Sequence, residues 1–117
     1  VLPQNVTLQI TDILSDNEAR TPTFGANSAL HIPGRQVAVK TGTTNNNKDA
    51  WAIGYTPSIV VGAWVGNNDN TPMKKGGAAL AGPIWNGVMT EALKDKPVEF
   101  FEKHSDKVDW RNPFCRF

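Results

Sequence analysis

Cysteine and long apolar runs are nearly missing from this sequence. Among 117 residues there is a single cysteine, Cys115, so the chain cannot form a disulfide within itself. One cysteine does not fix the redox compartment, and a thiol without a positioned base is expected to be inert. No run of about 18 consecutive apolar residues exists, so we expect no membrane-spanning helix in this chain.

An excess of charge of either sign is missing as well. The formal net charge is +1, with 12 Lys and Arg against 11 Asp and Glu, and Lys74-Lys75 is the only basic pair. A nucleic-acid footprint needs clustered basic residues, so no nucleic-acid partner is expected. His31 and His104 lie far apart, whereas a metal site needs closely spaced ligands, so no metal is expected. Nothing in the sequence indicates an organic cofactor either.

Apolar periodicity predicts a helix near each end of the region before residue 97. The first carries one apolar stripe, with Asn5 as the expected N-cap and Ser15-Asp16-Asn17 as its end or a turn. Its stripe consists of Val6, Ile10, Ile13 and Leu14. Residues 20–36 read as a connecting loop because Pro and Gly punctuate them. The second helix is expected to begin at Gly82-Pro83, with proline at the first helical position, and to pack across a sheet.

Three strands are expected between these helices, at residues 36–44, 50–56 and 59–66. Short turns between consecutive strands predict an antiparallel meander. The apolar run over residues 59–65 is typical of a strand that is buried on both faces. We interpret Trp51, Trp64 and Trp85 as core residues, since large aromatics dominate core burial.

A polar motif, Lys40-Thr41-Gly42-Thr43, ends the first expected strand. In a strand Thr41 and Thr43 share one face while Lys40 points to the other. Two hydroxyls can then hold a carboxylate, and the ammonium can face a separate polar network. The tripeptide alone would favour a different interpretation, a polar edge strand whose lysine prevents aggregation.

The sequence segments around the motif make its assignment more specific. The segments "LSDNEAR…FG", "VAVKTGTTNNNKDAWAIGYTP", "VVGAWVGNNDNTPM" and "GPIWNGVM" follow one another in the chain. Together they resemble the last part of the transpeptidase domain of a bifunctional, class A penicillin-binding protein, over roughly Gln4 to Leu93. The resemblance implies an α+β fold of the serine β-lactamase and penicillin-binding protein type. It also implies that only the C-terminal portion, an antiparallel sheet packed by helices, is present here.

The resemblance also implies roles for the motif. Lys40 would lie beside a catalytic serine, and Thr41 and Thr43 would bind the carboxylate of the substrate or a β-lactam. The Thr43 backbone N–H would form half of an oxyanion hole. Gly42 would let the acyl chain lie flat along the strand edge.

The family's nucleophile is absent from this chain. Its four serines are Ser15, Ser28, Ser58 and Ser105, and none has a lysine three residues later, so no Ser-x-x-Lys motif exists. The family also has a Ser-x-Asn motif, which lies much further upstream of its Lys-Thr-Gly motif. Ser15-Asp16-Asn17 matches that motif in letters, but it ends an apolar helix only 23 residues before Lys40, so we expect its side chains to cap or turn the chain. We expect the isolated chain to be inactive.

For the parent protein the resemblance implies a peptidoglycan D,D-transpeptidase that cross-links stem peptides, binds penicillin and carries a glycosyltransferase domain and a membrane anchor. It would act on the periplasmic side of the membrane, outside the cytoplasm. We expect residues 1–96 to belong to the transpeptidase domain, with the N-terminal portion of that domain as partner, and residues 97–117 to form a C-terminal tail. Two alternatives stay open: a non-catalytic fragment or binding module, and a relative of the serine β-lactamases.

Overall fold

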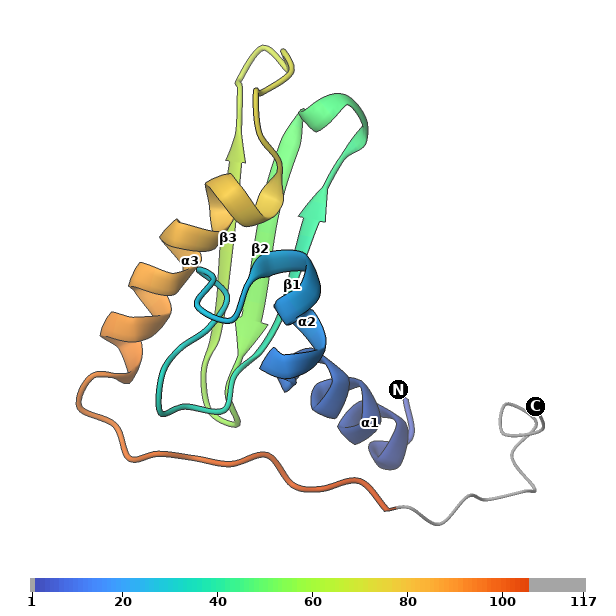
Figure 1. Cartoon of the computed structure of the whole chain (residues 1–117), viewed down its shortest axis with the longest axis vertical. Helices are drawn as coiled ribbons and strands as arrows, with labels where there is room; N and C mark the ends of the chain where they lie inside the picture. The colour runs from blue at the N-terminus through green and yellow to red at the C-terminus, as the bar shows by residue number, and fades with distance from the viewer. Residues whose placement is uncertain (1, 106–117) are drawn as a thin grey trace, which may run out of the picture.

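The computed structural model describes residues 2–105 and has the expected α+β fold. Three helices pack around one three-stranded sheet (Figure 1). In chain order the elements are α1 (Gln4–Ser15), α2 (Asn17–Phe24), β1 (Ala38–Thr43), the 3₁₀ turn η1 (Asn45–Asn47), β2 (Asp49–Tyr55), β3 (Val60–Gly66) and α3 (Gly77–Leu93).

The sheet is the antiparallel meander predicted from the short turns. Its strand order is β1-β2-β3, with both pairs antiparallel, and each strand lies within two residues of its expected bounds. Within residues 2–105, β1 and β3 are therefore both edge strands. The polar motif lies on the free edge of β1.

Helix α3 covers one face of the sheet, as expected. Residues paired across antiparallel strands point to the same face, so Ala50, Ala52, Val61 and Ala63 share the face that α3 buries. The largest fully buried side chains come from α3 itself, Trp85 and Met89. The interpretation of Trp85 as a core residue is confirmed.

The opposite face of the sheet is open to solvent along most of its length, and we call it the open face. Its side chains include Trp51, Ile53, Val60 and Trp64, which are 41%, 47%, 72% and 47% exposed. The expectation that Trp51 and Trp64 lie in the core is therefore wrong. So is the expectation that β3 is buried on both faces. The physical reason is that α1 packs only at one end of this face, where Thr11 bonds the Tyr55 hydroxyl at 2.8 Å.

The first helix forms where the apolar stripe predicts it, but its details differ. Pro3, not Asn5, occupies the N-cap position, without a side-chain hydrogen bond. Ile10 and Ile13 are exposed, and the one buried residue of α1 is Thr11. Val6 and Leu14 of the predicted stripe are half-buried, so the helix contacts the sheet through the polar Thr11–Tyr55 pair and through only part of the stripe.

The expectation of a loop over residues 20–36 is wrong in its first part, because α2 continues to Phe24 with Pro22 inside it. Two contacts stabilise this short helix. The Asp16 side chain caps it by accepting from the Ala19 N–H at 3.0 Å. The Arg20 guanidinium donates to the carbonyl oxygens of Leu14 and Leu30, and its burial lowers the pKa of Arg20.

The third helix begins earlier than predicted. It starts at Gly77 rather than at Gly82-Pro83, so Pro83 lies inside the helix. Its apolar side chains are only partly buried, since Ile84 and Val88 are exposed while Trp85 and Met89 are fully buried. The early start brings the first turn of α3 directly against the polar motif.

After α3 the chain returns along the end of the sheet to α1, as the orange segment of Figure 1 shows. We call residues 97–105 the strap. The strap is held by hydrogen bonds such as Phe101 N–H to Gln36 Oε1 at 2.8 Å and Ser105 N–H to Asn5 Oδ1 at 2.7 Å. The Phe101 ring also lies edge-on to Tyr55, with centroids 5.6 Å apart. Cys115 and the rest of the predicted tail lie outside the described residues.

Candidate functional site

The motif predicted as the site occupies the second half of β1. Lys40 and Thr43 are exposed, and Thr41 and Gly42 are half-buried. The strand alternation separates Lys40 from the two threonines, as predicted. The Lys40 ammonium donates to the carbonyl oxygen of Thr41 at 2.6 Å, so it lies against the backbone of its own strand.

The backbone of this motif presents hydrogen-bonding groups to the free edge of β1. The Thr44 N–H points inward, since it donates to the Asp49 carbonyl oxygen at 3.1 Å. Successive N–H groups of a strand alternate in direction across the ladder. The Thr43 N–H therefore points away from β2, toward the free edge.

The Thr43 side chain contacts the first turn of α3. Its Oγ1 accepts a hydrogen bond from the Gly77 N–H at 2.8 Å. Beside this contact lies a pocket of about 370 Å³, which we call the Thr43 pocket. It is lined by Phe24, Thr41, Thr43, Gly76, Gly77, Ala78 and Ala79.

A second pocket, of about 210 Å³, continues along β1 between the sheet and the α1–α2 corner. Lys40 and Thr41 line it from the strand, and Arg20 and Phe24 line it from α2. Thr41 thus borders both pockets. Sequence reasoning missed α2 and the Gly76-Gly77 pair as walls of the site, because residues 20–36 were interpreted as a loop and the last helix was expected to begin only at Gly82-Pro83.

A polar network fixes the turn that follows the motif. The Asp49 carboxylate accepts from the Thr44 hydroxyl at 2.8 Å and from the Trp64 indole N–H at 3.0 Å. These hydrogen bonds, that from Trp64 first, lower the pKa of Asp49. The network ties β1, β2 and β3 together one residue after Thr43.

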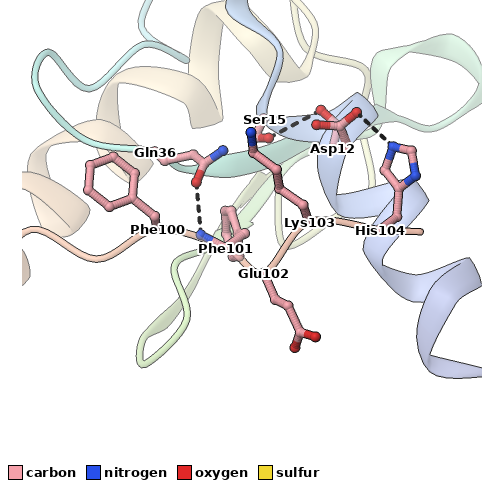
Figure 2. A pocket seen from close by; sticks show the side chains of 8 residues that line it. All are labelled: Asp12, Ser15, Gln36, Phe100, Phe101, Glu102, Lys103 and His104. Carbon is pink, nitrogen blue, oxygen red and sulfur yellow. Dashed lines mark hydrogen bonds and ion pairs between the residues drawn. The ribbon is translucent and has the colours of Figure 1, made fainter. Parts of the chain in front are cut away.

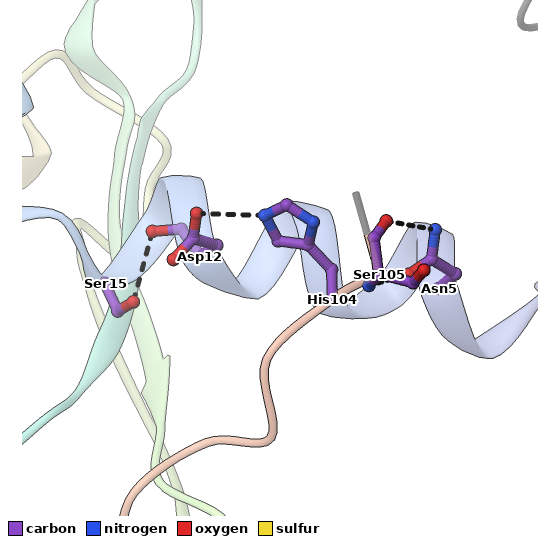
Figure 3. Close-up of polar contacts among 5 residues, drawn as sticks. All are labelled: Asn5, Asp12, Ser15, His104 and Ser105. Carbon is purple, nitrogen blue, oxygen red and sulfur yellow. Dashed lines mark hydrogen bonds and ion pairs between the residues drawn. The ribbon is translucent and has the colours of Figure 1, made fainter. Parts of the chain in front are cut away.

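Ser15-Asp16-Asn17 lies at the junction of α1 and α2 and has structural partners there. Figure 3 shows the Ser15 hydroxyl directed at α1, where it donates to the Asp12 carbonyl oxygen at 3.1 Å. Asp16 caps α2, and the Asn17 amide donates to the Ala26 carbonyl oxygen at 3.0 Å. These contacts are the capping and turn roles expected from the sequence.

A larger pocket, of about 440 Å³, lies between α1 and the strap (Figure 2). It brings Ser15, Asp12 and His104 near one another. The His104 Nε2 lies 3.4 Å from the Asp12 carboxylate, while the Ser15 hydroxyl is bonded to the Asp12 backbone. A serine nucleophile needs its base within hydrogen-bond reach, in the order serine, histidine, carboxylate. This arrangement lacks that order, so we assign the pocket no catalytic role.

Two classes of feature are absent from residues 2–105. No group of three or more His, Cys, Asp and Glu side chains is placed there to hold a metal ion. None of the helices described there is both long and apolar enough to cross a membrane.

The chain is similar to one part of penicillin-binding protein 1A from several bacteria. It is 36% identical to that of Rickettsia conorii over 105 residues, which cover 82% of this chain and 13% of the relative. It is 35% identical to that of Aquifex aeolicus over 118 residues, which cover 92% of this chain and 16% of the relative. The chain thus spans less than a fifth of the length of these relatives. No family model matches it.

A solved structure agrees with the sequence comparison. The crystal structure of penicillin-binding protein 1A from Haemophilus influenzae matches with a TM-score of 0.53 and 37% sequence identity. The match covers 57% of this chain and 10% of that protein.

Proposed function

This chain belongs to the penicillin-binding protein family, where it corresponds to one part of a longer chain, and we propose that it supplies the Lys-Thr-Gly strand of a peptidoglycan D,D-transpeptidase. The observation that carries the proposal is the free edge of β1. Along it, the Thr43 N–H, the Thr41 and Thr43 hydroxyls and the Lys40 ammonium occur within four consecutive residues.

Each residue of the motif has a role in this proposal. The Thr43 N–H donates to the oxyanion of the tetrahedral intermediate, where such a donor typically contributes about 3 kcal/mol. The Thr41 and Thr43 hydroxyls bind the carboxylate of the stem peptide or of a β-lactam. Gly42 leaves the strand edge clear for the acyl chain, and Lys40 assists proton transfer from the other side of the strand.

The nucleophile comes from the Ser-x-x-Lys segment, which this chain lacks. The serine oxygen attacks the carbonyl carbon of the penultimate D-Ala, and the terminal D-Ala leaves as the amine with the serine proton. The amine of a second stem peptide then attacks the acyl-enzyme. A new amide forms, and the serine regains its proton. A β-lactam reacts in the first step with opening of its ring.

The open face supports the proposal of a partner, the N-terminal portion of the same domain. Trp51, Ile53, Val60 and Trp64 form an apolar surface beside the free edge of β3. A monomer rarely exposes a large apolar surface that has no partner. We place the complete protein on the periplasmic side of the bacterial membrane, anchored through a segment other than this chain and carrying a separate glycosyltransferase domain.

Labelling with a fluorescent penicillin tests the proposal. The chain alone is expected to form no covalent adduct by intact mass spectrometry, because none of its serines has a lysine three residues later. Together with the N-terminal portion it is expected to yield one adduct per complex, located on the partner. An adduct on the chain alone would contradict the assignment, and no adduct in the complex would favour a non-catalytic binding module. Rapid multiple turnover of the β-lactam would favour the β-lactamase alternative.

A further inference from the structure

Two consecutive glycines bring the start of α3 into contact with the polar motif. Gly76 is the N-cap of α3 and Gly77 its first residue. The Gly77 N–H reaches Thr43 Oγ1 at 2.8 Å, across 34 positions of sequence. The contact joins the first turn of the helix to a threonine on the candidate site.

A side chain at either position would disturb this contact. A Cβ on Gly77 would lie 2.4 Å from the Gly42 carbonyl oxygen and 2.9 Å from that of Trp51, both backbone atoms that cannot move aside. A Cβ on Gly76 would lie 2.9 Å from Thr43 Oγ1 and 3.3 Å from Thr43 Cγ2. Gly77 thus allows the helix to approach the strand, and Gly76 leaves the Thr43 side chain its space.

The contact also determines how the Thr43 hydroxyl can act. A hydroxyl has one donor and two acceptor lone pairs. One lone pair takes the Gly77 N–H, and among residues 2–105 no hydrogen bond has the Thr43 hydroxyl as its donor. Because hydrogen bonds in a chain polarise one another, accepting from Gly77 makes the same hydroxyl a better donor. Its proton is available to the Thr43 pocket.

We propose that Gly76 and Gly77 are positioning residues that orient the Thr43 hydroxyl as a donor to the substrate carboxylate. The inference rests on the proposed function, since it assigns the recognition of the carboxylate to this orientation. It predicts that disturbing the glycine pair weakens recognition of the carboxylate specifically, and not acylation in general.

The test compares acylation of the complete transpeptidase by benzylpenicillin and by its methyl ester, which lacks the carboxylate charge. Gly76→Ala is expected to slow the free acid about 10- to 100-fold, the range of one charge-assisted hydrogen bond, and to change the ester rate less than about 3-fold. The matched control is Gly87→Ala in the same helix, where an added Cβ meets nothing within 4 Å. This control is expected to leave both rates unchanged.

A double substitution tests whether Gly76→Ala acts by changing the orientation of the Thr43 hydroxyl or by some other route. In a Thr43→Val background Gly76→Ala is expected to cause no further loss of discrimination between acid and ester, because both changes act through one hydroxyl. Equal slowing of acid and ester by Gly76→Ala would overturn the positioning role. An unmodified protein that reacts with neither compound would instead overturn the proposed function, and this inference with it.

If Gly76→Ala does not fold, a second measurement tests the inference. The Gly77 amide is expected to exchange its hydrogen at least about 10-fold faster in Thr43→Val than in the unmodified protein, since its acceptor is lost. Neighbouring amides of α3 serve as the internal reference. Unchanged protection of Gly77 would mean that the hydrogen bond to Thr43 is not formed, and would overturn the inference.

Discussion

Gly54→Ala tests how closely α3 packs on the sheet. Gly54 lies on the buried face of β2, where an added Cβ would lie 2.4 Å from Trp85 Cζ2 and 2.8 Å from the Ala38 carbonyl oxygen. Carbon atoms in good contact are about 3.5–4.0 Å apart, so the indole would have to move by more than about 1 Å. Trp85 is fully buried, and Ala38 is fixed by its pairing with Tyr55.

The expected change in the free energy of unfolding is the difference between two opposing contributions. Overpacking a core costs about 1–3 kcal/mol, and the upper end applies here because one of the two contacts is with backbone. Replacing a strand glycine by alanine returns about 0.5–1 kcal/mol. We therefore expect Gly54→Ala to lower the free energy of unfolding by about 2 kcal/mol, or the melting temperature by about 10 °C.

Gly62→Ala on β3 is the matched control. It lies on the open face, where an added Cβ would be 3.9 Å from Ile53 Cγ1, an ordinary contact. The control is expected to be neutral or to stabilise by up to about 1 kcal/mol. Urea unfolding of both variants at one protein concentration gives the comparison. Equal stabilities for Gly54→Ala and Gly62→Ala would refute the close packing of Trp85 on β2.

The remaining predictions concern the site, the turn after it and the free edge of β3. In the complete transpeptidase Lys40→Ala is expected to slow penicillin acylation by about two to four decades, and Lys40→Arg to recover little of the loss; stopped-flow acylation measures this, with Ser15→Ala as a control that stays near the unmodified rate. The hydrogen bonds from Trp64 and Thr44 lower the pKa of the Asp49 carboxyl. The stability that these bonds provide is therefore fully present above the ordinary Asp pKa of about 3.9, and it is lost as the pH falls through the lower pKa of the folded state. The Trp64 indole N–H resonance should shift in that acidic range, and Asp49→Asn should abolish the titration. The isolated chain is expected to associate through β3, with sedimentation that depends on concentration and that Val60→Lys reduces; a dilute monomer with protected amides on both edges of β3 would contradict this.

The strands could be predicted from the sequence because alternation and short turns determine them locally. Trp51 and Trp64 show where such reasoning stops. The alternation of a strand puts Trp51 on one face with Ile53 and Tyr55, but whether that face is buried depends on what packs against it. Among residues 2–105, α1 and Phe101 of the strap contact this face at its Tyr55 end, and the Trp51 and Trp64 end stays exposed.

The helices show a different limit of prediction from the sequence. Pro22 argued for a loop, since proline removes a helical hydrogen bond. The helix forms nonetheless, and the contacts of Arg20 with the carbonyl oxygens of Leu14 and Leu30 tie it to the end of α1 and to the loop that follows α2. At the site the edge motif was readable from local pattern, whereas the contact of Gly77 with Thr43 depends on the tertiary fold.

The strap has a consequence for how the chain folds. The Gln4 side chain bonds Glu102 and the Asn5 side chain bonds Ser105, across 98 and 100 positions of sequence. Closing a loop of about 100 residues costs roughly 4 kcal/mol in chain entropy, plus a constant, if nothing else is yet ordered. Once the sheet and α3 have formed, most of that loop is already fixed and the cost falls. We therefore predict that the strap docks late in folding and is released early in unfolding, so that the amide hydrogens of residues 97–105 exchange faster than those of β2.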